Sequence, residues 1–283
     1  MVLRSKKSGF GASRTQLLWI LLGTGEVHRD QHIPLGVRSR LRLFAAQCIL
    51  KLATCDAYAS LILPRMGRLS YALQDECFQV RMHLLHDLLL YLMRDELPTE
   101  FHAAIFLVAF DPEDEPRVQV ASYTRRLQVL PPIVRHERLE RIIVRFLHLL
   151  AHHPDLNAES PQTLCSFARY LEFYLACVAC ETNIGVLARF SACVRTYIDL
   201  SLSEPSVENS RPLYAMAELA QFLIQRLADN HGWTIYPVDE EAPCPKDILR
   251  STGTIARSVL DGEVWELLQQ QPRRHRDKKT KVA

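Results

Sequence analysis

Apolar residues recur along this chain at the spacing expected for one face of an α-helix. The clearest run occupies positions i, i+3, i+4, i+7, i+8 and i+11 and consists of Leu41, Phe44, Ala45, Cys48, Ile49 and Leu52. Similar runs follow at residues 80–92, 101–108 and 139–150. Strict alternation of apolar and polar residues does not persist over six or more positions in any segment. The pattern therefore predicts an all-α protein without strands.

Prolines and polar clusters divide the pattern into separate helices. The pairs Ser160-Pro161 and Glu115-Pro116 place proline where a first helical turn tolerates a missing N–H, and Ser210 precedes Pro212 in the same way. Polar, proline-containing clusters such as "FDPEDEP" and "SLSEPSVENS" end the helices. The chain from about residue 37 to 229 is thus predicted to form antiparallel helix pairs on short connections, in a bundle or a solenoid.

The stretch "QDECFQVR" favours the solenoid. In stacked helical hairpins, an aspartate at the turn can cap the second helix, and an arginine one turn later can pair with that aspartate or its neighbour. Asp75, Val80 and Arg81 fit these positions, with the valine packed between repeats. Asp111 and Arg117 form a looser second instance. The alternative is that Asp75 is an ordinary cap and Arg81 a solvated side chain. The prediction is a HEAT-type α-solenoid.

Composition narrows the class of protein. The 34 basic and 32 acidic residues give a net charge of +2, so the overall charge does not indicate bulk binding to nucleic acid. Eight cysteines are spread through apolar patterns, which suits a reducing compartment. The apolar run at residues 17–22 is too short to span a bilayer and is not followed by an A-x-A-like cleavage site. We therefore expect an intracellular protein that does not bind membranes.

Four ordered blocks resemble the precocious-dissociation-of-sisters family, the HEAT-repeat regulators of cohesin. The blocks are "RSRLRLFAAQCILKLA" (38–53), "LSYALQDECFQVR" (69–81), "LPTEFHAAIFLVAFDPEDEPR" (97–117) and "FLHLLAHHPDL" (146–156). A fifth block, "HGWTIYPVDEEAPCPKDILR" (231–250), is similar to the segment in which fungal members leave the solenoid. The matching part corresponds to the C-terminal repeats of much longer family members.

The resemblance implies a nuclear, non-enzymatic scaffold that acts in sister chromatid cohesion and binds cohesin subunits or their regulators. Contacts made by the N-terminal arm of family members do not carry over, including those to the Wings-apart-like protein, to inositol phosphate and to the kleisin subunit. A solenoid cut between repeats leaves an apolar face uncovered, so either the atypical segment 1–36 forms a makeshift cap or the chain is a fragment, and we favour the fragment. The solenoid is expected at 37–229, an irregular segment with a short terminal helix at 230–271, and a basic disordered tail at 272–283.

Catalytic, cofactor and metal sites are not predicted. Cys177 and Cys180 have metal-like spacing, but a structural zinc site needs four ligands, and a second such pair is absent nearby. His148 and His152 share a helix face without the glutamate of an HExxH motif, and they are interpreted as surface residues at a helix C-terminus. The chain also lacks a G-x-S-x-G elbow, a phosphate-binding glycine loop and a G-x-G-x-x-G fingerprint.

Two groups of arginines are the predicted partner-binding residues. One group begins a helix, and the other forms a stripe beside an apolar face; the groups are Arg38, Arg40 and Arg42, and Arg135, Arg138, Arg141 and Arg145. The stripe could contact DNA phosphate or an acidic peptide, or it could be a solvated face that pairs with Glu137 and Glu140. The tail from Arg273 to Lys281 is interpreted as a nuclear-import signal or a nonspecific DNA contact.

Two further functions of similar solenoids remain as alternatives. A HEAT-like DNA glycosylase would need an aromatic residue beside an aspartate on a concave basic face. Trp19, Trp233 and Trp265 lie towards the chain ends, which disfavours this function. A transport receptor or adaptor of the same architecture is the other alternative, because fold alone does not determine function.

Overall fold

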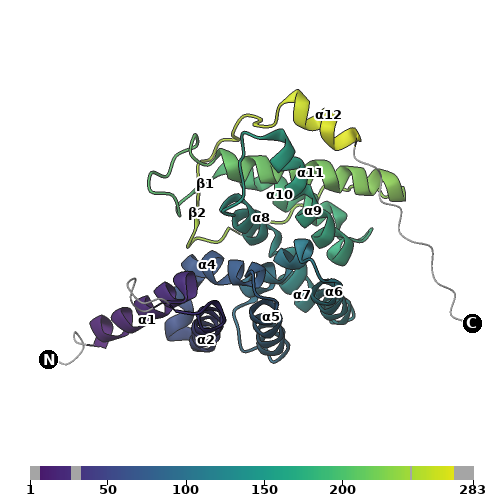
Figure 1. The fold of residues 1–283 in the computed structure, drawn as a ribbon. Helices are drawn as coiled ribbons and strands as arrows, with labels where there is room; N and C mark the ends of the chain where they lie inside the picture. The colour runs from purple at the N-terminus through teal and green to yellow at the C-terminus, as the bar shows by residue number, and fades with distance from the viewer. Residues whose placement is uncertain (1–6, 27–32, 243, 271–283) are drawn as a thin grey trace, which may run out of the picture.

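The computed structural model describes residues 7–26, 33–242 and 244–270, and helices dominate it (Figure 1). The first half of the described chain contains α1 (Lys7–Thr24), α2 (Leu35–Ala53), α3 (Asp56–Ile62), η1 (Leu63–Arg65), α4 (Met66–Ser70), η2 (Tyr71–Gln74), α5 (Phe78–Met93), η3 (Thr99–Phe110) and α6 (Asp114–Gln128). The second half contains α7 (Pro132–Arg135), η4 (His136–Glu140), α8 (Ile143–Ala151), α9 (Pro161–Val178), α10 (Ile184–Cys193), η5 (Val194–Thr196), β1 (Tyr197–Asp199), α11 (Arg211–His231), β2 (Leu249–Ser251) and α12 (Gly262–Gln270).

Successive hairpins stack side by side, as a solenoid requires. Figure 1 shows α2, α5 and α6 in one row, and both neighbouring pairs are in contact. The segments η2, η3 and η4, which precede α5, α6 and α8, form a second layer, in which η2 contacts η3 and η3 contacts η4. Helices α8 to α11 continue the stack above this row. The predicted all-α solenoid is therefore confirmed.

Helix α5 shows how the sequence pattern produces the packing. Apolar residues recur every fourth position, and this stripe, Val80, Leu84, Leu88 and Leu92, is buried. Val80 is only 1% exposed, so its predicted inward position is confirmed. Burying a side chain of this size contributes about 1.5–3 kcal/mol, so the stripe is sufficient to fix the face that α5 turns inward.

Segment η3 is helical where the sequence predicts a helix, but its twelve residues form a 3₁₀-helix. Every residue from Phe101 to Ala109 is buried, so η3 lacks a solvated face. A 3₁₀-helix rises about 2.0 Å per residue, which gives about 24 Å for twelve residues. The sixteen residues of α5 reach about the same length at 1.5 Å per residue. In the 3₁₀ form, the twelve residues of η3 therefore extend about as far as the sixteen residues of α5.

The predicted helix starts are observed. Ser160 precedes α9, and its Oγ accepts a hydrogen bond from the Thr163 N–H at 3.3 Å, while Pro161 occupies the first turn. Helix α11 begins directly after Ser210 with Pro212 in its first turn, and it ends at Gly232, whose φ of 68° is favourable for glycine.

A short sheet contradicts the prediction that the chain lacks strands. Strands β1 and β2 pair antiparallel, with Ile198 opposite Arg250. Each strand has only three residues, and the strands lie about fifty positions apart in the sequence. A three-residue strand cannot show the alternation over four to eight residues on which sequence analysis depends.

The segment after α11 lies along the solenoid. The buried carboxylate of Glu218 in α11 accepts hydrogen bonds from the Val259 and Leu260 N–H groups at 3.0 Å and from the Ser258 hydroxyl at 2.9 Å. Helix α12 then packs against α9. The residues described after position 231 thus return across the helices, which differs from the expectation that this segment leaves the solenoid.

Helix α1 packs against α2 at the other end of the molecule (Figure 1). Trp19 is 4% exposed, and the Arg68 guanidinium lies 5.5 Å from the centre of its ring. Arg68 also donates a hydrogen bond to the Trp19 carbonyl at 3.2 Å. Helix α1 therefore packs on α2 and the Arg68 side chain, and its role as a cap stays a prediction. Among the described residues, no helix has the length and apolar character needed to cross a membrane.

Candidate partner-binding surface

Asp75 organises the turn between η2 and α5, although it does not occupy the predicted N-cap position. The residue that precedes α5 is Cys77. Asp75 lies two positions earlier, and its Oδ1 accepts a hydrogen bond from the Cys77 N–H at 2.8 Å. The predicted N-cap is therefore wrong by two residues. Asp75 stabilises an Asx turn at the helix entrance, and the helix itself begins after it.

Arg42 joins this turn to the preceding hairpin. Its Nε donates to Asp75 Oδ2 at 2.6 Å and its Nη2 donates to Asp75 Oδ1 at 2.9 Å, which makes the pair bidentate. Nη2 also reaches Glu76 at 3.0 Å. The hydrogen bond to Asp75 is the main cause that raises the pKa of Arg42. The sequence predicts that Arg42 binds a partner protein, but in the structure it forms an ion pair between two adjacent hairpins.

Arg81 repeats this role one hairpin further along. Its Nε donates to Asp111 Oδ2 at 2.8 Å, and Asp111 is only 6% exposed. Its Nη1 donates to the Asp75 carbonyl at 2.9 Å, and Nη2 pairs with Glu113. The aspartate that Arg81 binds through its side chain thus belongs to the next hairpin.

The looser second instance of the turn follows the same rule. Arg117 lies six residues after Asp111, as Arg81 lies six residues after Asp75, and each arginine donates to the carbonyl of its aspartate. Arg117 also pairs with the exposed Asp114. The three arginines therefore form a ladder that runs across adjacent hairpins, which supports the solenoid interpretation of the sequence.

The two other arginines of the first predicted group have separate environments. Arg38 is half-buried and pairs with Glu26, at the end of α1. Arg40 is exposed. The structure therefore does not bring the group together as one surface.

The second predicted group is mostly paired with acidic side chains. Arg135 pairs with Glu140 at 3.4 Å, and Arg138 pairs with Asp95 at 2.9 Å. Arg141 pairs with Glu137 at 3.2 Å and lies 3.7 Å from Glu240. These contacts agree with the alternative that the stripe pairs with acidic side chains of the same chain.

Arg145 corrects the prediction of a continuous exposed stripe. Its side chain is buried, and its Nη2 contacts both carboxylate oxygens of Asp247 at 2.7 and 2.8 Å. The acid comes from the segment that returns across the solenoid. Helical spacing alone cannot reveal such a cover, because the partner lies about a hundred positions away in the sequence.

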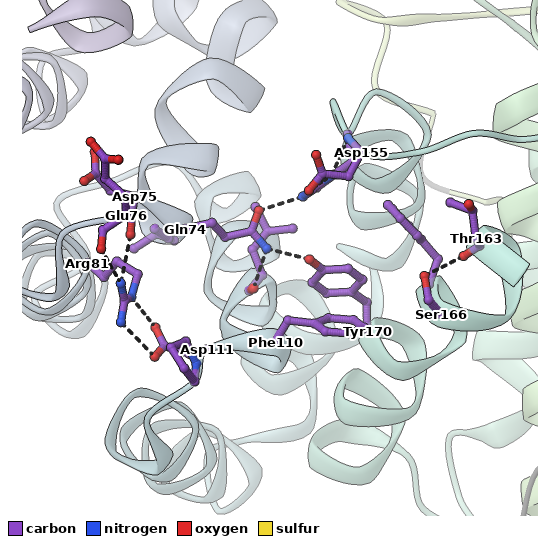
Figure 2. Close-up of a pocket in the computed structure, with 15 residues that line it drawn as sticks. Gln74, Asp75, Glu76, Arg81, Phe110, Asp111, Asp155, Thr163, Ser166 and Tyr170 are labelled. Atoms are coloured by element: carbon purple, nitrogen blue, oxygen red, sulfur yellow. Dashed lines mark hydrogen bonds and ion pairs between the residues drawn. The ribbon is translucent and has the colours of Figure 1, made fainter.

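A hollow lies beside the ladder, between η2 and α9 (Figure 2). At its centre, Gln74 donates to the Tyr170 hydroxyl oxygen at 2.6 Å and to the Leu107 carbonyl at 3.0 Å. His153 Nε2 lies 2.6 Å from the Gln74 Oε1. Burial lowers the pKa of His153, so the neutral ring is favoured. These polar groups satisfy one another, and Arg81 and Asp111 at the rim belong to the ladder.

A groove of about 700 Å³ lies on the other side of Phe110, and we call it the Arg169 groove. Most of its lining is apolar or basic, with Phe110, Pro112, Arg117, Arg169, Phe173, Leu223, Arg226 and Leu227, and Asp111, Glu172 and Asn230 also line it. The exposed Arg169 guanidinium lies 4.1 Å from the centre of the Phe110 ring. Arg226 pairs with Glu172 at 2.5 Å. The groove thus combines an apolar floor with basic groups.

Sequence reasoning missed Arg169. It is a single arginine within the mostly apolar stretch "SFARYLEFYL" of α9. Its position beside Phe110 depends on the packing of α9 against η3, which local spacing does not encode. The local sign in the sequence that Arg169 could be functional was a basic residue within a mostly apolar helix.

The prediction that His148 and His152 are surface residues is wrong for His148. His148 is 7% exposed, and burial lowers its pKa. Both imidazoles approach Asp199 of β1, and His152 remains half-buried. Burial alone would raise the pKa of Asp199, but the hydrogen bonds from the two histidines lower it below its usual range. The sequence did not predict β1, which carries Asp199, so it could not place this carboxylate beside the two histidines.

The two cysteines of the CxxC pair lie in different environments. Burial raises the pKa of Cys177 to about 11, which keeps the thiol protonated. Cys180 lies just beyond α9, with its Sγ 3.2 Å from Thr182 Oγ1.

The basic tail from Arg273 to Lys281 lies outside the described residues.

Comparisons with known proteins agree on one family. The family model described as "Sister chromatid cohesion protein PDS5 protein" matches residues 4–250. The Schizosaccharomyces pombe sister chromatid cohesion protein pds5 is 27% identical over 247 residues, which is 87% of this chain and 20% of that protein. PDS5 of Saccharomyces cerevisiae is 24% identical over 255 residues, which covers 82% of this chain and 20% of that protein.

A vertebrate relative matches a shorter region with higher identity. PDS5 homolog A of Danio rerio is 34% identical over 157 residues, which is 51% of this chain and 12% of that protein. The chain thus spans about a fifth of the length of the curated fungal relatives it matches.

Proposed function

Because the chain belongs to the PDS5 family of sister chromatid cohesion proteins, we propose that it is a non-enzymatic scaffold in sister chromatid cohesion. The observation that carries this proposal is the family match across residues 4–250, which covers all the stacked hairpins. The proposed partners are subunits of the cohesin complex or their regulators. The proposed location is the nucleus, because cohesion between sister chromatids, for which the relatives are named, acts on chromosomes.

The Arg169 groove is the surface that we assign to a partner. An interface core typically combines aromatic and arginine side chains with few other charges. The half-buried Phe110 and Phe173 supply apolar area, and Arg169 is exposed beside them. Arg226 and Arg117 add positive charge, which Glu172 and Asp114 offset in part. Of these cations, Arg169 contacts the Phe110 ring and is the one most available to an incoming carboxylate.

The occupant that fits is an extended segment of a partner with an aromatic or aliphatic residue next to a carboxylate. The apolar side chain would cover the floor between Phe173 and Leu227, and the carboxylate would reach Arg169. Arginine residues at the centre of an interface commonly contribute about 2 kcal/mol or more. Reversing the charge at Arg169 should therefore weaken binding by at least about thirtyfold.

The test is capture of cohesin by the tagged chain, followed by quantitative detection of each cohesin subunit and known regulator. The parent chain should retain at least one of them, and Arg169→Glu should lose it. Arg65→Glu is the matched control, because Arg65 is also exposed but lies outside the groove. Absence of every cohesin component from the parent capture would overturn the cohesin assignment. Equal capture by the parent and by Arg169→Glu would show that the partner does not bind at the Arg169 groove, and it would not contradict the scaffold proposal.

The arginines predicted from the sequence remain a second set to test. Arg40 is exposed, whereas Arg38, Arg42, Arg135, Arg138 and Arg141 already contact acidic side chains. A nonspecific DNA contact through them would show a strong salt dependence. We do not favour the DNA glycosylase alternative: Trp19 is buried beneath Arg68, and Trp265 packs on Phe222.

A further inference from the structure

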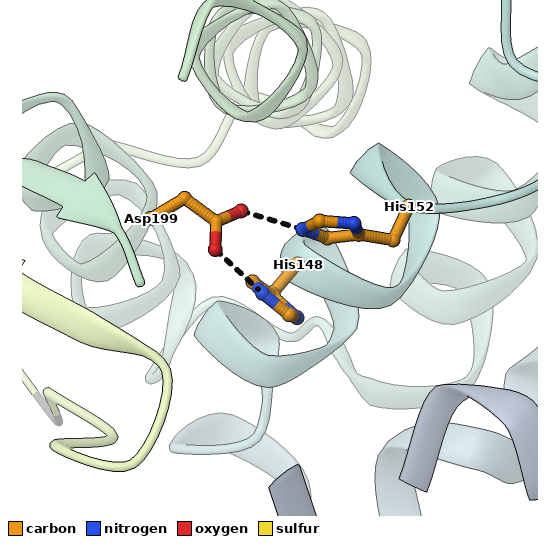
Figure 3. A group of neighbouring side chains, drawn as sticks. All are labelled: His148, His152 and Asp199. Carbon is orange, nitrogen blue, oxygen red and sulfur yellow. Dashed lines mark hydrogen bonds and ion pairs between the residues drawn. The ribbon is translucent and has the colours of Figure 1, made fainter. Parts of the chain in front are cut away.

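His148, His152 and Asp199 converge on one point between the end of α8 and strand β1 (Figure 3). The three side chains offer ligand atoms that all lie within 4.8 Å of one another. In the part of the chain that the structure describes, this is the single group of three or more such residues. We propose that these three residues form a binding site for a divalent transition metal ion of the zinc type. This inference is independent of the proposed scaffold function.

The ligand types suit such an ion. Zn²⁺ binds imidazole nitrogen and carboxylate oxygen, and two histidines with one carboxylate form a recurring three-ligand set. His148 lies in α8, and His152, four residues later, directly follows the helix; their ring centroids are 4.4 Å apart. His148 Nε2 lies 3.3 Å from Asp199 Oδ1, and His152 Nε2 lies 2.6 Å from Oδ2. Both rings therefore present the same nitrogen to one carboxylate.

An oxygen that could complete the coordination lies nearby. The Ser201 hydroxyl is 3.1 Å from His148 Nε2. Ser201 also fixes the carboxylate, because its N–H donates to Asp199 Oδ1 at 2.8 Å. The Asp199 N–H in turn donates to Ser210 Oγ at 3.0 Å. Such supporting hydrogen bonds hold the ligands of metal sites in place and tune the affinity.

The charge of the site favours a cation. Asp199 is 2% exposed, and a bound cation would lie against its buried carboxylate. Arg145, a basic side chain on the same helix as His148, donates instead to both carboxylate oxygens of Asp247. A divalent ion would replace the two imidazole N–H donors and would balance the buried carboxylate.

Access to the site is available from one side. The side chain of His152 is 30% exposed, whereas those of His148 and Asp199 are 8% and 2% exposed. An ion could therefore enter past His152. The short contact between His152 and Asp199 must lengthen by several tenths of an ångström to admit a metal with bonds of about 2.0–2.2 Å.

The competing interpretation is a purely structural network in which both imidazoles donate to Asp199. Titration calorimetry with Zn²⁺ on the intact chain distinguishes the two. The metal site predicts one ion per chain with a dissociation constant of about 1 µM or below, and a rise in melting temperature on zinc addition. Asp199→Asn and His152→Asn should each weaken binding by at least about tenfold, since each removes one ligand.

His86→Asn is the matched control, because His86 is an exposed histidine on α5, away from this cluster. Cobalt binding provides a second readout, since ligation by nitrogen and oxygen lacks the charge-transfer band that a cysteine thiolate ligand would produce. If Asp199→Asn does not fold, His152→Asn at the rim decides the question. Unchanged zinc affinity in the folded variants, a thiolate band with cobalt, or no stoichiometric binding by the parent would each overturn the proposal.

Discussion

At the scale of single residues, the buried Arg81–Asp111 pair carries the largest expected effect. Both partners are almost inaccessible to solvent, with side chains 8% and 1% exposed. Removing one member of a buried pair leaves an uncompensated charge, which typically costs about 3–5 kcal/mol. Arg81→Ala should therefore lower the free energy of unfolding by about this amount, measured by urea denaturation monitored by circular dichroism.

Two further variants make this prediction specific. Arg65→Ala removes an exposed arginine and should change stability by less than about 0.5 kcal/mol. Arg81→Met combined with Asp111→Leu removes both charges and should be substantially more stable than Arg81→Ala alone. If Arg81→Ala behaves like the exposed control, the pair does not hold adjacent hairpins together.

His102 provides a residue-scale prediction about pH. It is 1% exposed, its Nδ1 lies 2.8 Å from the Thr99 carbonyl, and its Nε2 lies 2.9 Å from the Tyr123 hydroxyl. This arrangement suits a neutral ring that donates from Nδ1 and accepts at Nε2. Burial is the main cause that lowers the pKa of His102 to about 4. In the unfolded chain the same group should titrate near pH 6.5.

The sign of the pH effect follows from this difference. Between pH 6.5 and about 4 the unfolded chain binds a proton that the folded ring resists, so stability falls as the pH is lowered. The full effect of this one group is roughly 3 kcal/mol. Urea denaturation of the parent and of His102→Gln at pH 7 and pH 5 measures it. The variant should lose less stability over this interval than the parent, and an equal loss would contradict the prediction.

At the scale of elements, the helices differ in how strongly the sequence specifies them. The apolar stripe of α5 and the cap of α9 are local features, so both were predicted correctly. Segment η3 was predicted as a helix of unspecified winding, and its 3₁₀ form depends on burial on every side. Strands β1 and β2 exist only as a pair, because neither three-residue segment is stable alone.

The contact between α10 and the returning segment gives an element-scale prediction. A Cβ added to Gly185 would lie 2.6 Å from the Tyr236 carbonyl oxygen, which is too close for any side chain. Gly185→Ala should displace residues 233–242 and lower stability by about 1–3 kcal/mol. Limited proteolysis should then cut this segment faster than in the parent.

The matched control is another helical glycine. A Cβ added to Gly36, in the first turn of α2, would meet no atom within 4 Å, and Gly36→Ala should leave proteolysis unchanged. Its stability should stay equal or rise slightly, because alanine restricts the unfolded chain more than glycine does. Identical cleavage of parent and Gly185→Ala would mean that the segment is not held by this contact.

At the scale of the whole molecule, stacking makes stability a sum over neighbouring hairpins. In the row α2, α5 and α6, each helix contacts the next, so a local change at one end of this row should propagate only weakly. Arg42 links the α1–α2 hairpin to the turn at Asp75 through two hydrogen bonds. Arg42→Ala should therefore accelerate amide hydrogen exchange in α1 and α2, while α9 and α11 keep their protection.

Hydrogen exchange detected by mass spectrometry resolves these regions separately. Arg40→Ala is the control, since Arg40 is an exposed arginine on the same helix. Uniform acceleration across the whole chain in Arg42→Ala would indicate a single cooperative unit. That outcome would contradict the nearest-neighbour description of this solenoid.

The sequence by itself determined the helical class, most helix starts and the stacking of hairpins. These features rest on local information: apolar spacing, caps, prolines, and an aspartate followed six residues later by an arginine. Tertiary structure alone decided which charged groups remain available. Arg145 was predicted to be exposed and is covered by Asp247, and His148 lies buried against Asp199, in each case through a partner distant in sequence. Burial and long-range pairing depend on the packed chain, so local patterns could not reveal Arg169 in its groove or the histidine cluster.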